Sequence, residues 1–215
     1  MTTRPTPRAG GSRQRVLSAL RETTPQPVPL PDLRYASAEL TMPSRIEAFA
    51  NALAEAGAGF GRIANEAELE ATLRGYAPYA AAERVVSGVA GIGVRGEGTE
   101  LGGSPHSFSD VDVTVARGSF GVAENGAVWC DGEGLPHRAT YFLCQHLVLV
   151  VEAATLVETM HAAYERLGAQ RAQEAGRREA PWCGFIAGPS KTADIEQALV
   201  VGAHGPRSHF VVLVG

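Results

Sequence analysis

The sequence predicts an α/β protein with an open sheet flanked by helices, and two observations carry that prediction. The first is a continuous apolar run from His146 to Val151, typical of a strand buried on both faces, followed by a helix-periodic segment at 154–167. The second is a strand-like run at 182–187, after which a helix-periodic segment leads to a final strand at 209–214. Strands that alternate with helices along the chain are typical of α/β folds.

The first 42 residues form an N-terminal extension rich in Pro and Arg, and we place the α/β domain at 43–215. Residues 13–22 have the pattern of one short helix. Four prolines at 23–31 exclude a regular helix in that stretch. Four arginines among the first fifteen residues, mixed with Thr, Pro and Gly, favour a mobile tail over a phosphate-binding arm.

Regular patterns begin at Pro43. Ser44 is a candidate N-cap for a helix whose apolar positions recur at helical spacing and which ends at Gly57. A strand near 60–63 and a helix at about 66–74 follow, and the β-branched residues of 84–89 predict a further strand.

Residues 91–96 match the pattern GxGxxG letter for letter. The dinucleotide-binding form of this pattern requires a helix to begin there, because the pyrophosphate rests on the N-terminus of that helix. Residues 97–109 instead contain three more glycines and a proline, so no helix is expected. We therefore expect a glycine-rich loop.

A hairpin is predicted between Asp110 and Cys130, where apolar and polar residues alternate. The turn signal is Asn125-Gly126, because both residue types tolerate positive φ. This arrangement gives two strands with Glu124 at the bend.

Composition excludes several classes of function. The formal net charge of −4 and the pI near 5.9 give no basic face for nucleic acid. No apolar run approaches the ~20 residues that span a bilayer, and the first residues lack the apolar core of a secretion signal, so a cytoplasmic protein is expected.

The three cysteines, Cys130, Cys144 and Cys183, lie far apart and form no CxxC pair. This spacing supports neither a disulfide framework nor an iron–sulfur or structural zinc site. No cofactor or metal site is identified in the sequence, so any electron carrier is expected on another chain or as a small molecule.

Three blocks of sequence carry a family resemblance. They are Val113-Thr114 with Phe120 to Gly126 (FGVAENG), Gly188 to Glu196 (GPSKTADIE), and Gly202 to Pro206 (GAHGP). These blocks resemble the LUD domain of the lactate utilisation protein C family, also described as LutC/YkgG-like, over about 44–215. The short helix at 13–22 is also similar to the family's N-terminal segment.

The resemblance implies a NagB/RpiA/CoA-transferase-like fold. It also implies a role in the oxidation of L-lactate to pyruvate together with cysteine-rich and iron–sulfur partner proteins, so that the chain is a non-redox subunit of an L-lactate dehydrogenase complex. One departure stands out: the family usually reads Ala-Glu-Thr-Gly-Thr at the hairpin, whereas this chain has Asn125 and Ala127 in place of the two hydroxyl residues.

Glu124 has two interpretations. Glu124-Asn125-Gly126 resembles the motif around the catalytic glutamate of class I CoA transferases, in which the carboxylate attacks an acyl-CoA. Alternatively, Asn125-Gly126 is present for the backbone angles of the turn, and the Glu124 side chain is solvated or pairs with a neighbouring residue. Ligand contact by Glu124 or Asn125 is a third reading.

The segment from Gly188 to Thr192 is the candidate ligand site. If a helix begins after it, its amides with Ser190, Lys191 and Thr192 can hold a carboxylate or phosphate. The competing account is helix capping by Ser190 or Thr192, without any ligand.

Other polar residues offer weaker sites. Asp110 and Asp112 would share one face of a strand, yet two carboxylates are too few for a cation site. His204 and His209 bracket the last turn and are expected to be exposed or to stabilise it. His146 has no partner that the sequence identifies.

Three functions remain open at this point. The first is the lactate-oxidation subunit, which binds a small anion or a partner protein. The second is an acyl- or CoA-transferring enzyme with Glu124 as nucleophile, and the third is a metabolite-binding regulatory module. The sequence names neither the ligand, nor the oligomeric state, nor the electron acceptor.

Overall fold

A computed structural model describes residues 11–23, 28–29, 40–94, 104–132, 134–173, 182–194 and 197–215. The chain forms two compact units, Met1–Ala36 and Ser37–Gly215. The first contains α1 (Ser12–Thr23), which confirms the short N-terminal helix, and none of its residues is buried. The predicted domain boundary after residue 42 stays a prediction. Among the described helices, none has the length and apolar character needed to cross a bilayer.

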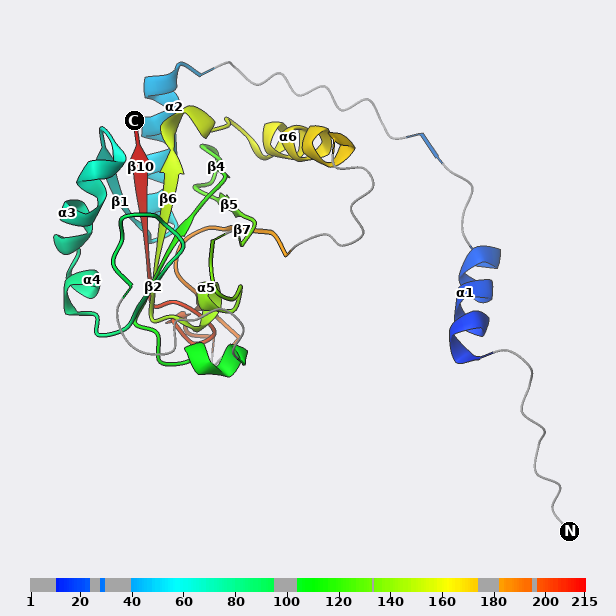
Figure 1. Cartoon of the computed structure of the whole chain (residues 1–215). Helices are drawn as coiled ribbons and strands as arrows, with labels where there is room; N and C mark the ends of the chain where they lie inside the picture. Colours follow the sequence, from blue (N-terminus) through cyan, green and yellow to red (C-terminus); the bar gives the residue numbers. More distant parts are fainter. Residues whose placement is uncertain are drawn as a thin grey trace, which may run out of the picture. The chain divides into compact units, whose positions relative to one another are not determined.

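A parallel sheet of five strands forms the centre of the second unit (Figure 1). Its strands, in spatial order, are β1 (Gly59–Ile63), β10 (Ser208–Val214), β6 (His146–Glu152), β3 (Val113–Arg117) and β2 (Val85–Ser87). β6 pairs with β10 on one side and β3 on the other, and residues 147–151 are buried. The doubly buried strand predicted from the apolar run is therefore confirmed, as are the strands at 60–63, 84–89 and 209–214.

One face of this sheet is covered by short helices that follow β1. They are η1 (Glu66–Glu68), α3 (Leu69–Arg74) and α4 (Ala77–Ala81), and they confirm the helix predicted at 66–74. Leu69, Leu73 and Tyr79 pack there against the valines that the central strands present to this face of the sheet. The described part of the GxGxxG segment, 91–94, forms turns and no helix; the rest of it lies outside the described residues.

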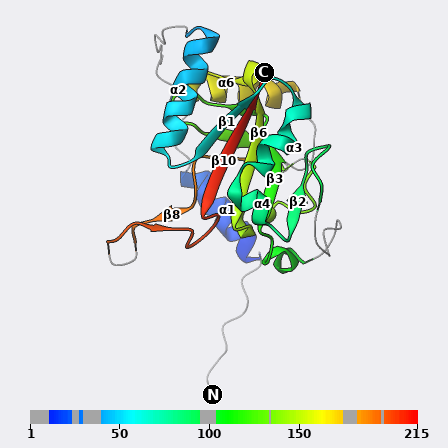
Figure 2. The same ribbon diagram turned by 90° about the vertical axis from the view of Figure 1, so that its left-hand side faces the viewer.

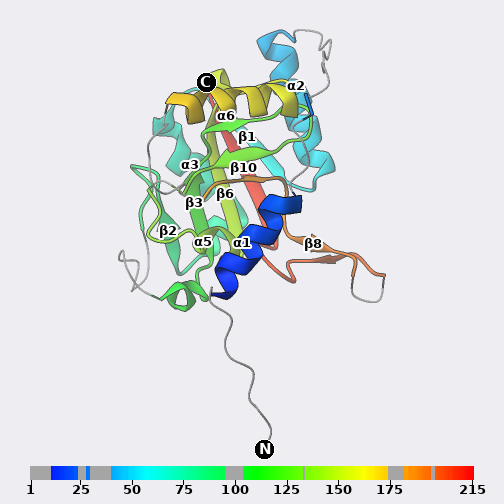
Figure 3. The ribbon, with the colours of Figure 1, turned by 90° about the vertical axis from the view of Figure 1, so that its right-hand side faces the viewer.

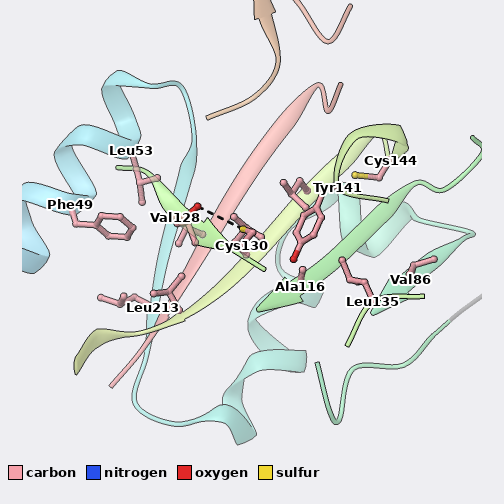
Figure 4. Packing of buried hydrophobic residues seen from close by; sticks show 14 of the residues in the cluster. Phe49, Leu53, Val86, Ala116, Val128, Cys130, Leu135, Tyr141, Cys144 and Leu213 are labelled. Atoms are coloured by element: carbon pink, nitrogen blue, oxygen red, sulfur yellow. Dashed lines mark hydrogen bonds between the residues drawn. The ribbon is translucent and has the colours of Figure 1, made fainter. Parts of the chain in front are cut away.

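The other face packs against α2 (Met42–Glu55) and a small antiparallel sheet. That sheet has the order β4 (Phe120–Gly121), β5 (Val128–Cys130) and β7 (Gly184–Ile186), and α5 (Thr140–Leu143) lies nearby. Figure 4 shows Phe49 and Leu53 of α2 facing Val128 and Leu213. The N-cap of α2 is Thr41, whose hydroxyl accepts from the Ser44 amide, so Ser44 is not the cap.

The predicted hairpin differs from the structure in the number of its strands. The segment from Asp110 to Cys130 contains three strands instead of two, because β3 joins the central sheet and only β4 and β5 pair as a hairpin. Asp110 and Asp112 precede β3 and do not share a strand face, so that expectation is wrong. The Asp112 carboxylate instead accepts from the amides of Glu83 and Arg84, both at 2.9 Å.

The helix predicted at 154–167 begins later, as α6 (Met160–Gln173). A 3₁₀ turn, η3 (Ala153–Thr155), comes first, and then Val157 forms a parallel bridge with Val122. Residues 158 and 159 then bend before α6 begins. α6 then crosses the outer side of the small sheet (Figure 3), where Ala163 is buried with Phe120 and Val122.

Three further elements lie in the described part of this unit. η2 (Pro105–Phe108) lies before β3, and β8 (Lys191–Thr192) pairs with β9 (Val200–Val201) as a hairpin that projects from the body (Figure 2).

Candidate functional site

The helix predicted after Thr192 is absent from the described residues there. Residues 193, 194 and 197–199 are not helical, and 195–196 lie outside the described residues. β8 and β9 pair in this region instead, with Lys191 opposite Val201 and Thr192 opposite Val200. In the loop between the two arms, Gln197 adopts φ 57°, which a right-handed helix does not permit. The strand–helix–strand unit predicted at the end of the chain is therefore wrong.

Without that helix, the candidate ligand segment lacks the helix N-terminus that was expected to attract an anion. The prediction placed an anion at the positive end of a helix, which needs free amides in a first helical turn. In the structure, the Ser190 amide donates to the Pro206 carbonyl at 2.9 Å. The Thr192 hydroxyl lies 3.4 Å from an Asp194 carboxylate oxygen. A ligand at these residues stays a prediction, now without a helix terminus to attract it.

Lys191 lies at the C-terminal end of a helix, α2, where cations and not anions are favoured. Its ammonium donates to the carbonyl of Ala56, the C-cap residue of α2. The last carbonyls of a helix carry partial negative charge, so a cation is favourable at this position. Lys191 therefore has a structural partner that its sequence context did not indicate.

Two glycines from different sequence blocks meet the same end of α2. Gly188 has φ +71°, and a Cβ there would lie 2.5 Å from the Ala56 carbonyl oxygen. Gly126 has φ +69°, and a Cβ there would lie 2.9 Å from the Leu53 amide nitrogen. Both positions require glycine for backbone angle and for close approach. Two of the three blocks that carry the family resemblance thus converge on the last turns of α2.

Glu124 lies at the start of α6. One oxygen of its carboxylate accepts from the Met160 amide at 2.8 Å, and its own amide donates to the Glu158 carbonyl at 3.0 Å. A negative group at a helix N-terminus is favourable and satisfies an amide that has no partner within the helix. Glu124 is exposed, and its observed contacts are those of a helix cap.

Asn125 shapes the turn between β4 and β5. Its side-chain oxygen accepts from the Ala127 amide at 3.0 Å, which closes an Asx turn, and the Gly126 amide donates to the Val122 carbonyl. The amide side chain at 125 therefore supports the turn in the absence of the family's hydroxyl.

A hydrogen-bonded group of side chains that the sequence did not indicate lies at the amino-terminal ends of β6 and β10. The Ser208 hydroxyl is 2.7 Å from Nδ1 of His146 and also bonds the Tyr76 hydroxyl. These residues are far apart in the sequence, and only the parallel register, which places Ser208 opposite His146, brings two of them together. No local motif could have revealed this group.

His209 is buried, contrary to the expected exposed or turn-stabilising role. It lies within β10 at 2% exposure, and neither ring nitrogen has a hydrogen-bond partner. Burial lowers its pKa from 6.5 to about 4, because the cationic form loses its hydration. His204 is exposed, as expected.

The cysteines are free thiols. Cys130 and Cys144 are buried, and burial raises the pKa of each, that of Cys144 to about 11. Within the described ranges, His, Cys, Asp and Glu form no group of three or more that could hold a metal ion.

A pocket of about 450 Å³ lies away from the predicted ligand segment. It is lined by Glu70, Arg74, Tyr79, Ala80 and Gly93. The Tyr79 hydroxyl donates to the Glu70 carboxylate at 2.7 Å, and Arg74 pairs with the same carboxylate group. The structure therefore does not combine this pocket with the residues predicted for ligand binding.

Comparison with protein families gives a match to the LUD domain over residues 104–214, just over half of the chain. The chain belongs to the LUD domain family. The matched range runs from η2 to β10, so it includes the Glu124 turn, the Gly188 segment and three strands of the central sheet.

Several relatives of this LUD domain protein share about a third of its residues over the aligned segment. Lactate utilization protein C of Shouchella clausii is 33% identical over 104 residues, 48% of this chain and 44% of that protein. Lactate utilization protein C of Bacillus pumilus is 36% identical over 93 residues, or 43% and 38% of the two chains. YkgG of Escherichia coli K12 is 34% identical over 94 residues, or 44% and 40%. The alignments thus span less than half the length of these relatives.

A solved structure supports the fold of this LUD domain protein. The crystal structure of a DUF162 family protein from Deinococcus radiodurans matches with a TM-score of 0.58 at 19% identity, and it covers 82% of this chain and all of that one. The shared arrangement therefore extends beyond the range of the family match.

Proposed function

We propose that this LUD domain protein is a cytoplasmic subunit of an L-lactate-oxidising system. In this role it takes part in converting L-lactate to pyruvate beside cysteine-rich and iron–sulfur proteins that transfer the electrons. The observation that carries the proposal is membership of the LUD domain family, together with relatives named lactate utilization protein C at about 33% identity. The NagB/RpiA/CoA-transferase-like class is proposed for the fold on the same resemblance.

The contacts of the motif residues support a structural role for the motifs, in which they shape the surface of the domain. Gly126 and Gly188 seat their loops on the end of α2, Lys191 caps that helix, and Glu124 caps α6. Each of these motif residues therefore has a structural role within the domain, either by close packing against a helix or by a hydrogen bond to a helix end. We infer that the blocks fix the relative positions of α2, α6 and the β8–β9 hairpin, and that partner proteins or a small anion then meet a preformed surface.

The test is reconstitution of lactate oxidation. The purified chain alone is expected to give no pyruvate from L-lactate, whereas the chain mixed with the iron–sulfur and cysteine-rich partner proteins restores it. Omitting this chain from the mixture is the control and should abolish the activity. Pyruvate formed by the isolated chain, or full activity of the partners without it, would refute the proposal.

Loss of function in a variant must be separated from loss of fold. Lys191→Ala removes a cap at an exposed position and should leave the domain folded, so it tests the predicted ligand segment. Arg62→Ala is a matched control, since it removes another exposed cation whose partner is a backbone carbonyl, that of Gly215. A loss of reconstituted activity in the first variant alone would place the ligand or partner contact at Lys191.

A further inference from the structure

The Ser208 hydroxyl bridges two other side chains at one end of the central sheet. Its oxygen lies 2.7 Å from Nδ1 of His146 and bonds the hydroxyl of Tyr76. Ser208 and His146 are paired across β10 and β6, and Tyr76 comes from the junction between α3 and α4. Three separate parts of the chain thus place a hydroxyl between a base and a second hydroxyl, and the Ser208–His146 distance is within the range at which a base activates a nucleophile.

The protonation states make this chain of hydrogen bonds directional. Burial and the positive charge of Arg207 lower the pKa of His146, while Asp112 opposes this, so the imidazole is neutral at pH 7. Burial raises the pKa of Tyr76, so the phenol keeps its proton. With the His146 proton on Nε2, Tyr76 donates to Ser208, and Ser208 donates to Nδ1 of His146.

The position of the group allows a ligand to approach. Tyr76, His146 and Ser208 are each partly exposed, in contrast to the buried residues that follow them in β6 and β10. The Tyr76 ring stacks on Phe210, with centroids 4.7 Å apart and planes at 13°, which fixes the direction of the phenol. Tyr76 is therefore held on a rigid apolar support beside the hydroxyl.

We propose that Ser208 is an activated nucleophile, with His146 as its general base, for acyl transfer from small carboxylic esters or thioesters to water. This activity is independent of the proposed role in lactate oxidation. It also differs from the transferase reading of Glu124, whose carboxylate caps α6. The arrangement assigns the nucleophile to a residue outside the GPSKTADIE and FGVAENG blocks.

The reaction has two balanced stages. In the first, Ser208 Oγ forms a bond to the carbonyl carbon, its proton passes to Nδ1 of His146, and the carbonyl electron pair moves to oxygen, toward which Tyr76 can donate. Collapse breaks the bond to the leaving alcohol or thiol, which takes the proton from His146. In the second, water attacks acyl-Ser208 by the same route and releases a carboxylic acid.

The test uses the full chain with an alkyl fluorophosphonate, which reacts with activated serines, and with p-nitrophenyl acetate. Intact mass and peptide mapping should find one adduct, at Ser208, with loss of fluoride. Ser208→Ala should remove the adduct. His146→Ala should slow labelling and ester hydrolysis by about 100-fold, the usual contribution of a general base.

Ser119 provides a matched control. It is also half-buried and hydrogen-bonded, but its hydroxyl donates to the Asp131 carboxylate at 2.7 Å instead of to an imidazole. Ser119→Ala should label like the wild type. Tyr76→Phe keeps the stacked ring, so it serves if His146→Ala does not fold, and it should slow labelling without loss of the folded signal.

Two results would overturn the proposal. One is a folded wild-type protein that forms no adduct at Ser208. The other is unchanged labelling in His146→Ala and in Tyr76→Phe. If the group serves only to tie the α3–α4 junction to the sheet, these variants lower the melting temperature while Ser208 shows no reactivity in any of them.

Discussion

His209 should make the stability of this protein strongly dependent on pH. The unfolded chain protonates this imidazole at its ordinary pKa of 6.5, whereas burial lowers the folded-state pKa to about 4. Below pH 6.5 the unfolded state therefore binds more protons, and stability falls as the pH falls toward 4. The difference of about 2.5 pH units, at 1.36 kcal/mol per unit, corresponds to about 3 kcal/mol in total. Above pH 6.5 this contribution is fully present.

The measurement is urea unfolding followed by circular dichroism from pH 7.5 to 4.5. His209→Leu replaces the imidazole by an apolar side chain of similar size, on the face of β10 that also carries the core residues Val211 and Leu213. The wild type should lose about 2–3 kcal/mol more than this variant across the range. His204→Gln, at the exposed histidine, should follow the wild type. Parallel curves for the wild type and His209→Leu would refute the argument from burial.

Three substitutions test the roles of the motif residues in the fold. Gly188→Ala should destabilise by about 2–4 kcal/mol, because it adds a clash with the Ala56 carbonyl to the cost of positive φ, and thermal melting would detect this; Gly168→Ala, with open space around its Cβ, should be neutral or stabilising by up to about 1 kcal/mol, and equal effects would contradict the packing argument. Glu124→Gln should cost about 0.3–1 kcal/mol in urea unfolding at low ionic strength and less at 0.5 M salt, whereas no salt dependence would exclude the helix-dipole term. Lys191→Met should cost a similar amount through the end of α2, and a stabilised variant would show that its ammonium does not cap the helix.

The central strands could be predicted from the sequence because a local run of apolar residues indicates a buried strand. The run from His146 to Val151 has too few polar residues for a surface element, and 209–214 is similar. The start of α2 was predicted to within a few residues, although Thr41 and not Ser44 makes the cap. The turn at Gly126 could also be predicted, because Asn-Gly tolerates the positive φ that this position adopts, +69°.

The errors came from contacts that local pattern does not encode. The helix expected after Thr192 had suitable periodicity, yet its apolar Leu199 is 66% exposed, and strand pairing across the hairpin determined the backbone there. The delayed start of α6 follows from a bridge between Val157 and Val122 in another part of the chain. The Ser208 group depends on the register of two strands and could not be inferred from any single segment.

The order of strands has a consequence for how the protein is made. Among the five strands of the central sheet, β10 (Ser208–Val214) comes last in the sequence, yet it lies between β1 and β6. During translation β1 is synthesised long before β10, its neighbour in this sheet, so its backbone and apolar residues stay unpaired until β10 has emerged and are open to aggregation or to chaperone binding. A truncation that removes Ser208–Val214 would take an interior strand out of the sheet, and the truncated chain should be cleared by proteases.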